Sequence, residues 1–302
     1  MNLNRLDLNL LVALDALLTE CSITRAGERL HLSPSATSGA LSRLRIYFED
    51  DLLTQIGRRM VPTPLGESLQ HAVRECLLHV QQVAEIRPQF DPATSKRNFK
   101  LMMSDFVATV LMPQVLRRVQ REAPGITFEL LANDHEPWES LSRGEIDFLV
   151  LPEKFICADH PSRVLFEEEY VCVCWSGNSV VGNSITISLE QCLELGHVIT
   201  RVGTQRPPTI DAWFFERFGH ARRVQVVATT FTGVPHMLVG TDRLCIMHRR
   251  LALLYAESLS LRLLPVPIEM PRLVEMLQWH KYRDNDPSRI WLTELLIAAV
   301  AD

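Results

Sequence analysis

The residues between Ser33 and Phe48 combine short hydroxyl side chains with arginines, and their only charged residues are basic. Hydroxyls can reach base edges at short range, and arginine binds phosphate or guanine, so this mixture suits a helix in the major groove of DNA. An amphipathic helix with a solvated polar face is the alternative, because helix-turn-helix motifs have loose signatures. The predicted DNA contacts on this helix are Ser33, Pro34, Ser35, Thr37, Ser38, Ser42, Arg43 and Arg45.

A helix-turn-helix is expected to position these residues. Ser33 can accept a hydrogen bond from a backbone N–H at the start of the second helix, and Pro34 suits the first helical position. Thr24 is expected to cap the preceding helix, and residues 31–32 to form the turn. Another helix over residues 6–20 has leucines on one face and would support the pair. Residues at three- and four-residue spacing predict the buried face of the second helix: Ala36, Ala40, Leu41, Leu44 and Phe48.

Two short extended runs on either side of Gly57 predict a β-hairpin after these helices. Arg58 and Arg59 would lie at its tip, within reach of a minor groove or the DNA backbone. A helix, a helix-turn-helix and a basic hairpin together make a winged helix-turn-helix. We predict this DNA-binding domain for residues 1–63.

Thr63-Pro64 begins a further helix with a coiled-coil-like apolar seam. We expect residues 64–90 to be a linker that dimerises, because a small DNA-binding domain needs a two-fold partner to read two half-sites. A helix packed on its own domain is the alternative. The seam consists of Leu65, Leu69, Val73, Cys76, Val80 and Val83.

Strand and helix patterns alternate from residue 97 onward, and a βαβαβ order predicts a parallel sheet with helices on its faces. A second α/β unit follows, and the chain then returns with a strand at 273–281 and a helix from Pro287. Small ligands bind between two such lobes. The effector-binding domain is predicted at 91–302, with lobe I at about 97–167 and 269–302 and lobe II at about 168–268. Helices are expected in lobe II at 210–219 and 234–240.

The composition fits a globular protein, with 47% apolar residues, 22% charged residues and a net charge of −5 that does not single out a nucleic-acid binder. No apolar run is long enough for a membrane span, and the N-terminal segment lacks the pattern of a signal peptide. Seven scattered cysteines favour free thiols in a reducing cytoplasm. Cys172 and Cys174 share one strand face, so a metal or redox switch is the alternative to buried thiols. Without a CxxC or a histidine cluster, we predict no metal and no cofactor.

The whole chain resembles LysR-type transcriptional regulators, most specifically over residues 7–66. The segments DLNLLVALDALLTE, LSRLR, DDLLTQIGRRMVPTP and WHKYRDNDPSRIWL are similar to the branch of NodD-type nodulation activators. Regulators that respond to salicylate, nitroaromatics and chlorinated phenols are near relatives of that branch. The resemblance implies an α/β fold, with a winged helix-turn-helix and linker helix before a two-lobed effector domain like that of periplasmic binding proteins.

The resemblance also implies how such a protein works. It implies a cytoplasmic homotetramer, built as a dimer of dimers, that binds an inverted repeat in double-stranded promoter DNA and acts with RNA polymerase. A small aromatic effector bound between the lobes would change DNA binding and bending, and a flavonoid and a chlorinated or nitrated phenol are both compatible with the residues. This sequence departs from the pattern at Pro34, where relatives usually have glutamine, and at Gly27, where alanine is usual. Proline cannot pair with adenine as glutamine does, so base reading is expected to shift to the hydroxyls and Arg43.

The effector site is carried over from the positions that line the family's cleft. Ser104 and the next N–H groups can hold a polar or anionic oxygen, unless Ser104 is only a helix cap. Arg201 can pair with a phenolate or carboxylate, or lie in a solvated loop. An aromatic at Phe231 is as often a core residue as a ligand wall. His280 is expected on the hinge side with Trp279, and a lone histidine is more often structural than a ligand contact. The implied site is Ser104, Asp105, Phe106, Val107, Arg201, Gly203, Thr204, Phe231, Thr232, Trp279 and His280.

Enzyme motifs are missing from the sequence: it has no nucleophile elbow and no Gly-rich phosphate loop, so we predict that the protein is not an enzyme. An allosteric regulator is the favoured interpretation, because an effector that prefers one lobe closure would shift the assembly. The alternatives are a constitutive regulator with an empty or blocked cleft, and a solute-binding module with a vestigial DNA domain.

Overall fold

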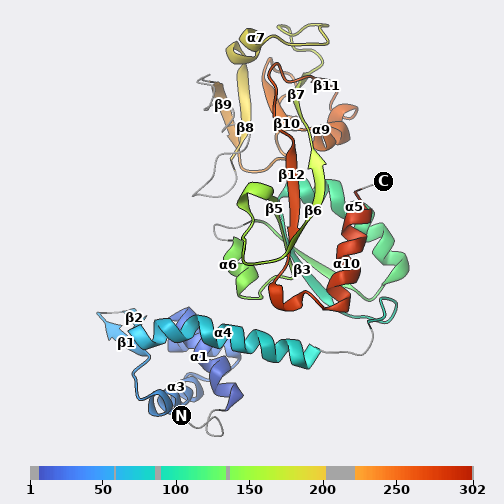
Figure 1. Ribbon diagram of the computed structural model, residues 1–302. Helices are drawn as coiled ribbons and strands as arrows, with labels where there is room; N and C mark the ends of the chain where they lie inside the picture. Colours follow the sequence, from blue (N-terminus) through green and yellow to red (C-terminus); the bar gives the residue numbers. More distant parts are fainter. Residues whose placement is uncertain (1–6, 58, 86–89, 134–136, 202–221, 301–302) are drawn as a thin grey trace. The chain divides into compact units, whose positions relative to one another are not determined.

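The computed structural model describes residues 7–57, 59–85, 90–133, 137–201 and 222–300 (Figure 1). The chain divides into two compact units, residues 1–87 and 88–302. In the part of the chain that is described, no helix combines the length and apolarity that a membrane span requires.

The N-terminal unit consists of helices followed by a β-hairpin and a long helix, and it has the predicted winged helix-turn-helix architecture. The hairpin strands are antiparallel, with Ile56 opposite Arg59 beside the turn. In chain order the elements are α1 (Leu8–Glu20), α2 (Ile23–Leu30), α3 (Pro34–Phe48), β1 (Leu53–Ile56), β2 (Arg59–Pro62) and α4 (Pro64–Glu85).

Helix α2 begins earlier than predicted. The expected cap, Thr24, lies inside the helix, and Ser22 is the N-cap residue: its Oγ accepts a hydrogen bond from the backbone N–H of Arg25 at 3.3 Å. Serine and threonine are both favoured at the N-cap position, so residue type alone does not show which of the two caps the helix. The helix ends at Leu30, and the C-cap residue His31, in the left-handed conformation with a φ of 55°, makes the predicted turn toward α3.

Helix α4 packs on the core of its own unit through residues from its start as far as Leu77. Leu69 and Val73 pack against the leucines of α1, whereas Cys76 and Val80 are exposed and Val83 is 69% exposed. The predicted seam is therefore divided between the two interpretations of this helix. The intradomain alternative applies to its start, and dimerisation through its later residues stays a prediction.

The C-terminal unit contains two five-stranded sheets, one for each lobe (Figure 1). The lobe I sheet has the order β4-β3-β5-β12-β6 and the lobe II sheet the order β11-β7-β10-β8-β9. Lobe I contains β3 (Asn98–Met102), α5 (Asp105–Glu122), β4 (Thr127–Leu131), α6 (Pro137–Ser142), β5 (Phe148–Pro152), β6 (Ser162–Glu168), β12 (Leu273–Gln278) and α10 (Pro287–Ala298). Lobe II contains β7 (Tyr170–Trp175), α7 (Leu189–Glu194), β8 (Gly196–Thr200), β9 (Arg223–Ala228), β10 (Leu244–His248), α9 (Arg249–Ala256) and β11 (Leu261–Leu264).

The chain crosses between the sheets at two places. β6 ends at Glu168 and β7 begins at Tyr170, so one residue separates strands of different sheets. The return crossing is the segment 265–272 between β11 and β12. The run 165–175 thus contributes strands to two sheets.

Two helix predictions in lobe II have different outcomes. The helix expected at 234–240 is wrong, because only the short 3-10 turn Pro235–Met237 forms there. The helix expected at 210–219 lies outside the described residues. Elsewhere in the lobe, α7 has a complete capping box, in which Ser188 and Gln191 exchange hydrogen bonds.

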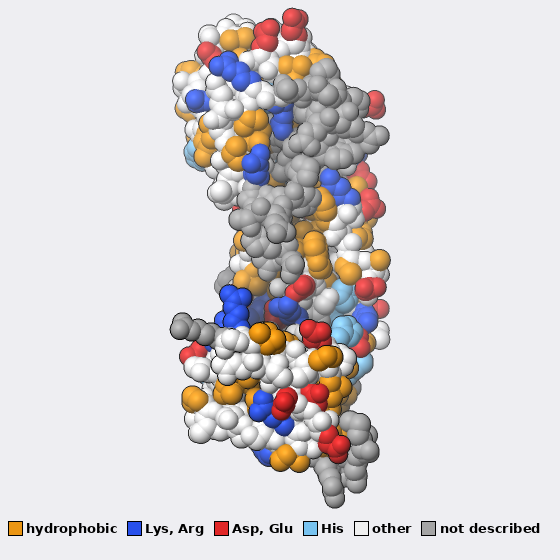
Figure 2. Space-filling view, turned by 90° about the vertical axis from the view of Figure 1, so that its left-hand side faces the viewer, with side chains coloured by type: hydrophobic (Ala, Val, Ile, Leu, Met, Phe, Trp, Pro, Cys, Tyr) orange, Lys and Arg blue, Asp and Glu red, His pale blue; other side chains and the backbone are white. Residues whose placement is uncertain are grey.

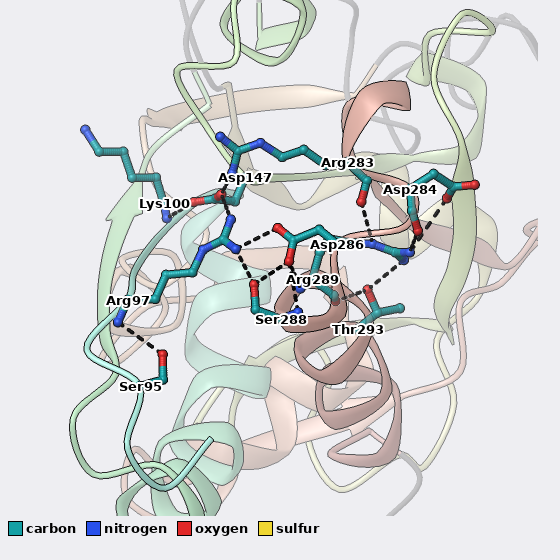
Figure 3. A network of polar contacts seen from close by, with 10 residues as sticks. All are labelled: Ser95, Arg97, Lys100, Asp147, Arg283, Asp284, Asp286, Ser288, Arg289 and Thr293. Carbon is teal, nitrogen blue, oxygen red and sulfur yellow. Dashed lines mark hydrogen bonds and ion pairs between the residues drawn. The ribbon is translucent and has the colours of Figure 1, made fainter. Parts of the chain in front are cut away.

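A polar network ties the first strand of lobe I to its last helix (Figure 3). The carboxylate of Asp147, a buried residue, accepts hydrogen bonds from Arg97 at 3.0 Å, from the backbone of Lys100 at 2.8 Å and from Arg283. Arg97 also donates to Asp286 at 2.6 Å. A buried carboxylate is stable only when it is paired in this way, so the network holds α10 on the end of the sheet.

Asp286 caps α10 and titrates below its usual range. Burial raises the pKa of its carboxyl, but a hydrogen bond from Ser288 and the charge of Arg97 more than offset this, so that the pKa is lowered. A lowered carboxyl pKa stabilises the folded state at neutral pH, and this contribution is lost as the pH falls through the folded pKa.

Candidate functional site

The start of α3 is arranged as the sequence predicts. Ser33 caps the helix, since its Oγ accepts a hydrogen bond from the N–H of Ala36 at 3.2 Å, and Pro34 occupies the first turn. The hydroxyls of Ser33 and Ser35 lie 3.0 Å apart. Both residues are exposed, so two polar groups are available at the positive end of this helix.

The predicted DNA-contacting face of α3 is largely solvent-exposed. Ser35, Ser38, Ser42 and Arg43 are exposed, and within the described part of the chain the Arg43 guanidinium has no hydrogen-bond or ion-pair partner. Basic and acidic side chains are interspersed over the face of the molecule drawn in Figure 2. The placement of individual arginines, more than net charge, therefore has to provide attraction for phosphates.

Thr37 does not belong to this face. It is 0% exposed, and its hydroxyl donates to the carbonyl of Ser33 at 3.1 Å. Ala36, predicted as buried, is exposed instead. The reason is a close approach between α2 and α3: a Cβ at Gly27 would lie 2.9 Å from the Thr37 Oγ1 and 3.0 Å from the Leu32 carbonyl oxygen. The glycine at position 27 is thus matched to a buried threonine at position 37.

Arg45 holds the hairpin in place. Its guanidinium donates to the backbone carbonyls of Asp51 and Leu53, both at 2.8 Å, so it joins α3 to the start of β1. A direct DNA contact was predicted for Arg45, but these donors already have partners. Of the two arginines expected at the hairpin tip, Arg59 is exposed at the start of β2, and Arg58 lies outside the described residues.

Asp105 connects the two lobes. It is the first residue of α5, and its carboxylate accepts hydrogen bonds from the backbone N–H of Phe231 at 3.2 Å, the N–H of Thr232 at 2.8 Å and the Thr232 hydroxyl at 2.7 Å. Ser104 caps the same helix, with its Oγ accepting from the N–H of Val107 at 3.2 Å. The cap interpretation of Ser104 therefore holds, whereas no local sequence pattern signals the interlobe role of Asp105.

An aromatic cluster fills the contact beside this carboxylate. Phe106 is 1% exposed and stacks on the His248 ring with centroids 3.8 Å apart, while Phe231 meets both rings edge-on. Val107 is fully buried as well. Burial lowers the pKa of His248 to about 3, and among the described residues its Nδ1 has no hydrogen-bond partner. The residues predicted as ligand walls are core residues here.

The remaining predicted effector positions of lobe II follow β8. The N–H of Arg201 donates to the Ala228 carbonyl at 2.8 Å, which places this residue at the end of the sheet with an exposed side chain. Gly203 and Thr204 lie outside the described residues. The Arg201 side chain is therefore exposed to solvent, whereas the Phe106 side chain is buried in the core.

Trp279 and His280 lie at the wrong end of β12 for a hinge site. β12 pairs with β6 so that Leu273 is opposite Glu168 at the crossing and Gln278 is opposite Ser162 at the far end. Both residues are buried, and Trp279 donates to Asp284 at 3.0 Å while His280 caps the turn that follows. The predicted hinge location is wrong, because an antiparallel return strand carries residues after Gln278 away from the crossing.

Two buried carboxyls lie at the crossing itself. Glu168 accepts hydrogen bonds from the backbone of Glu169 at 3.0 Å and of Arg250 at 3.2 Å, and it pairs with the Arg250 guanidinium at 3.4 Å. Glu275 is 4% exposed, and burial, followed by the charge of Glu168, raises its pKa to about 8. Glu275 is thus protonated at neutral pH. Burial raises the pKa of its neighbour Glu168 as well, and the hydrogen bond and ion pair of Glu168 with Arg250 hold the start of α9.

The buried cysteines of lobe II form no disulfide among the described residues, and no cluster of three or more His, Cys, Asp or Glu side chains there has a metal-binding arrangement. Cys172 and Cys174 are both buried, with the shared strand face that was expected. A hydrogen bond from Cys172 lowers the pKa of Cys192 to about 5. These side chains pack with apolar neighbours, as free thiols do.

Family models match nearly the whole chain. Residues 8–67 match the model described as bacterial regulatory helix-turn-helix protein, lysR family, and residues 93–301 match the LysR substrate binding domain. Among curated proteins, Nodulation protein D 1 of Bradyrhizobium sp. (strain NC92) is 42% identical over 302 residues, covering 100% of this chain and 96% of the relative. Nodulation protein D 1 of Rhizobium meliloti (strain 1021) is 41% identical, covering 98% and 96%.

Solved structures show the same fold. A probable transcriptional regulator from Pseudomonas aeruginosa is 30% identical with a TM-score of 0.66, and 97% of each chain is covered. Full-length CbnR in complex with its target DNA is 15% identical with a TM-score of 0.60, covering 97% of this chain and 100% of CbnR. The second similarity concerns the fold alone.

Proposed function

Because the chain belongs to the LysR family of bacterial regulatory helix-turn-helix proteins, we propose that it is a transcriptional activator controlled by a small aromatic effector. Family membership makes it a DNA-binding transcriptional regulator and not an enzyme. The aromatic effector, activation through RNA polymerase, assembly as a homodimer or homotetramer and a cytoplasmic location are parts of the proposal.

The proposed DNA contacts are the exposed residues of α3 and the wing. Ser33, Ser35, Ser38 and Ser42 offer short hydroxyls to base edges, and Arg43 offers a guanidinium without an internal partner. Arg59 of the wing would contact the backbone or a minor groove. Since Pro34 cannot make an amide pair with adenine, the preferred operator should differ from that of relatives with glutamine at this position.

One observation carries the effector part of the proposal: the Asp105 carboxylate in lobe I accepts three hydrogen bonds from residues 231–232 of lobe II. A phenolic hydroxyl can donate to the same carboxylate, and it would then compete with the Thr232 hydroxyl. A ligand that exchanges partners at this point changes the contact between the lobes, which is the differential interaction that allostery requires. Ser104, Arg201, Gly203 and Thr204 complete the proposed site.

The test uses full-length protein and two readouts. A thermal-shift screen against phenolic acids, chlorophenols, hydroquinones and flavonoids identifies a ligand, because a ligand at a hundred times its Kd stabilises the fold by about 2.7 kcal/mol. We expect Asp105→Asn to change the Kd of that ligand at least about tenfold, while the exposed control Asp159→Asn leaves it unchanged. The effector proposal fails if operator affinity, footprint and bend angle are the same with and without every bound ligand.

A constitutive regulator is the second candidate, and the packing of Phe106, Phe231 and His248 favours it, because these rings already occupy the expected ligand walls. No hit from any ligand class, with operator binding intact, would support this candidate. The substitution Arg43→Glu distinguishes a regulator from a solute-binding module. A regulator would lose its operator, whereas a solute-binding module would keep its ligand and lose no function.

A further inference from the structure

A cavity of ≈ 570 Å³ lies beside the two crossings, and none of its lining residues belongs to the proposed effector site. Tyr170 and Val171 line it from the first crossing, and Val266, Ile268 and Met270 line it from the second. Leu253 of α9 contributes a further wall. This volume lies within the range of small-molecule sites, about 300–1,000 Å³, and the lining is mostly apolar, as such sites are.

The charged residues of this crossing cavity leave one positive charge unpaired. Glu169, Arg249 and Arg272 line the cavity. Arg272 pairs with Glu167 and with Glu169, both at 3.2 Å. Arg249 is exposed, its side chain has no hydrogen-bond or ion-pair partner within the described residues, and its backbone N–H is bound to the Glu169 carbonyl. The backbone of Arg249 is thus fixed beside the cavity, and its guanidinium is available to a ligand.

We propose that the crossing cavity is a second small-molecule site that binds an amphipathic carboxylate. The apolar body would lie against the walls from both crossings, and the carboxylate would accept paired hydrogen bonds from Arg249, the geometry that a guanidinium favours. Because the ligand touches both segments that connect the lobes, its binding resists changes in their relative position. The site acts on lobe closure from outside the cleft and is independent of the proposed aromatic effector.

Calorimetric titration of the full-length protein with octanoate tests the charge requirement. We expect saturable binding of octanoate that Arg249→Gln weakens roughly tenfold to a hundredfold, because a charge-assisted pair is lost. Arg121→Gln, which removes an exposed arginine from α5, should leave it unchanged. Octanamide, which has no charge, should bind more weakly than octanoate and be insensitive to Arg249→Gln. No saturable octanoate binding, or equal Kd values for octanoate and octanamide, overturns the proposal.

A pair of neighbouring residues on α9 tests the location. Leu253 lines the cavity and is 49% exposed, whereas Leu254 is 57% exposed and is not part of the lining. Both positions are at the surface, so tryptophan should be tolerated at either. We expect Leu253→Trp to fill the cavity and abolish octanoate binding, and Leu254→Trp to leave it intact. Octanoate binding that survives Leu253→Trp and Arg249→Gln but is lost in Arg201→Gln places the ligand in the effector site and refutes the second site. An aromatic effector should bind Leu253→Trp normally.

Discussion

The predicted DNA-contacting residues are mostly exposed, whereas most of the predicted effector-contacting residues are buried or already have partners. On α3, Ser35, Ser38 and Arg43 are exposed and available to a partner. In the C-terminal unit, Phe106 and Val107 are buried in the core, and Asp105 already has partners in the other lobe. A helix places its polar face by its own period, so a short segment suffices to predict it. A site between lobes depends on residues more than a hundred positions apart, and no local pattern records which of them meet.

The largest expected effect comes from a buried ring. Phe106→Ala should lower the free energy of unfolding by about 3–5 kcal/mol, through lost burial and the cavity left behind. Ser38→Ala on α3 should change it by less than about 0.5 kcal/mol. Urea unfolding followed by tryptophan fluorescence measures the first, because all five tryptophans lie after residue 87; circular dichroism follows the second. If Phe106→Ala costs less than about 1 kcal/mol but weakens effector binding, Phe106 is a ligand wall after all.

The next effect depends on pH. Folding raises the pKa of Glu275 from its ordinary 4.5 to about 8, so between these values the unfolded chain releases a proton that the folded protein keeps. Stability should therefore fall as the pH rises from about 4.5 to 8, by up to about 1.4 kcal/mol per pH unit. Glu275→Gln should flatten this slope in urea titrations at pH 5, 6, 7 and 8. An identical slope in the variant would mean that Glu275 is ionised in the fold.

Two arginines of α3 sharpen the contrast between contact and support. Arg43→Ala should leave thermal stability unchanged, weaken operator binding by about 1–3 kcal/mol if it reads a guanine, and reduce the salt slope by about one if it meets a phosphate. Arg45→Ala should lower stability by less than about 1 kcal/mol, since the side chain is partly exposed, and reduce affinity through a displaced wing. Fluorescence anisotropy across a salt series measures both. Loss of stability in Arg43→Ala would remove the distinction.

The smallest effect concerns the contact between α2 and α3. Gly27→Ala would place a methyl group 2.9 Å from the Thr37 Oγ1, and this crowding should outweigh the helix propensity that alanine gains, for a net loss of about 1 kcal/mol. Combined with Thr37→Ala, the loss should be less than the sum of the single effects. Thermal unfolding of the four proteins in this cycle gives the coupling. Additive effects would show that the two residues do not constrain each other.

Several local features were predictable from short stretches. The Ser33-Pro34 start of α3, the hairpin around Gly57 and the alternating strands of the effector domain depend on neighbours within a few residues. The errors arise where distant segments compete for the same residue. Thr37 is polar and was assigned to the surface, but the gap beside Gly27 buries it. The hydroxyl finds a partner within its own helix, so burial carries little penalty.

The sequence by itself determined the fold class, most of the order of the elements and most of the exposed face of α3, because helix and strand periods and capping are local properties of the chain. Only the tertiary structure decided that Arg45 supports the wing, that Asp105 bonds to lobe II and that Trp279 lies away from the crossing. Strand order and register decide which groups lie close together, and these contacts produce the outcomes. Buried donors and acceptors must be satisfied, and the partners that satisfy them come from anywhere in the chain.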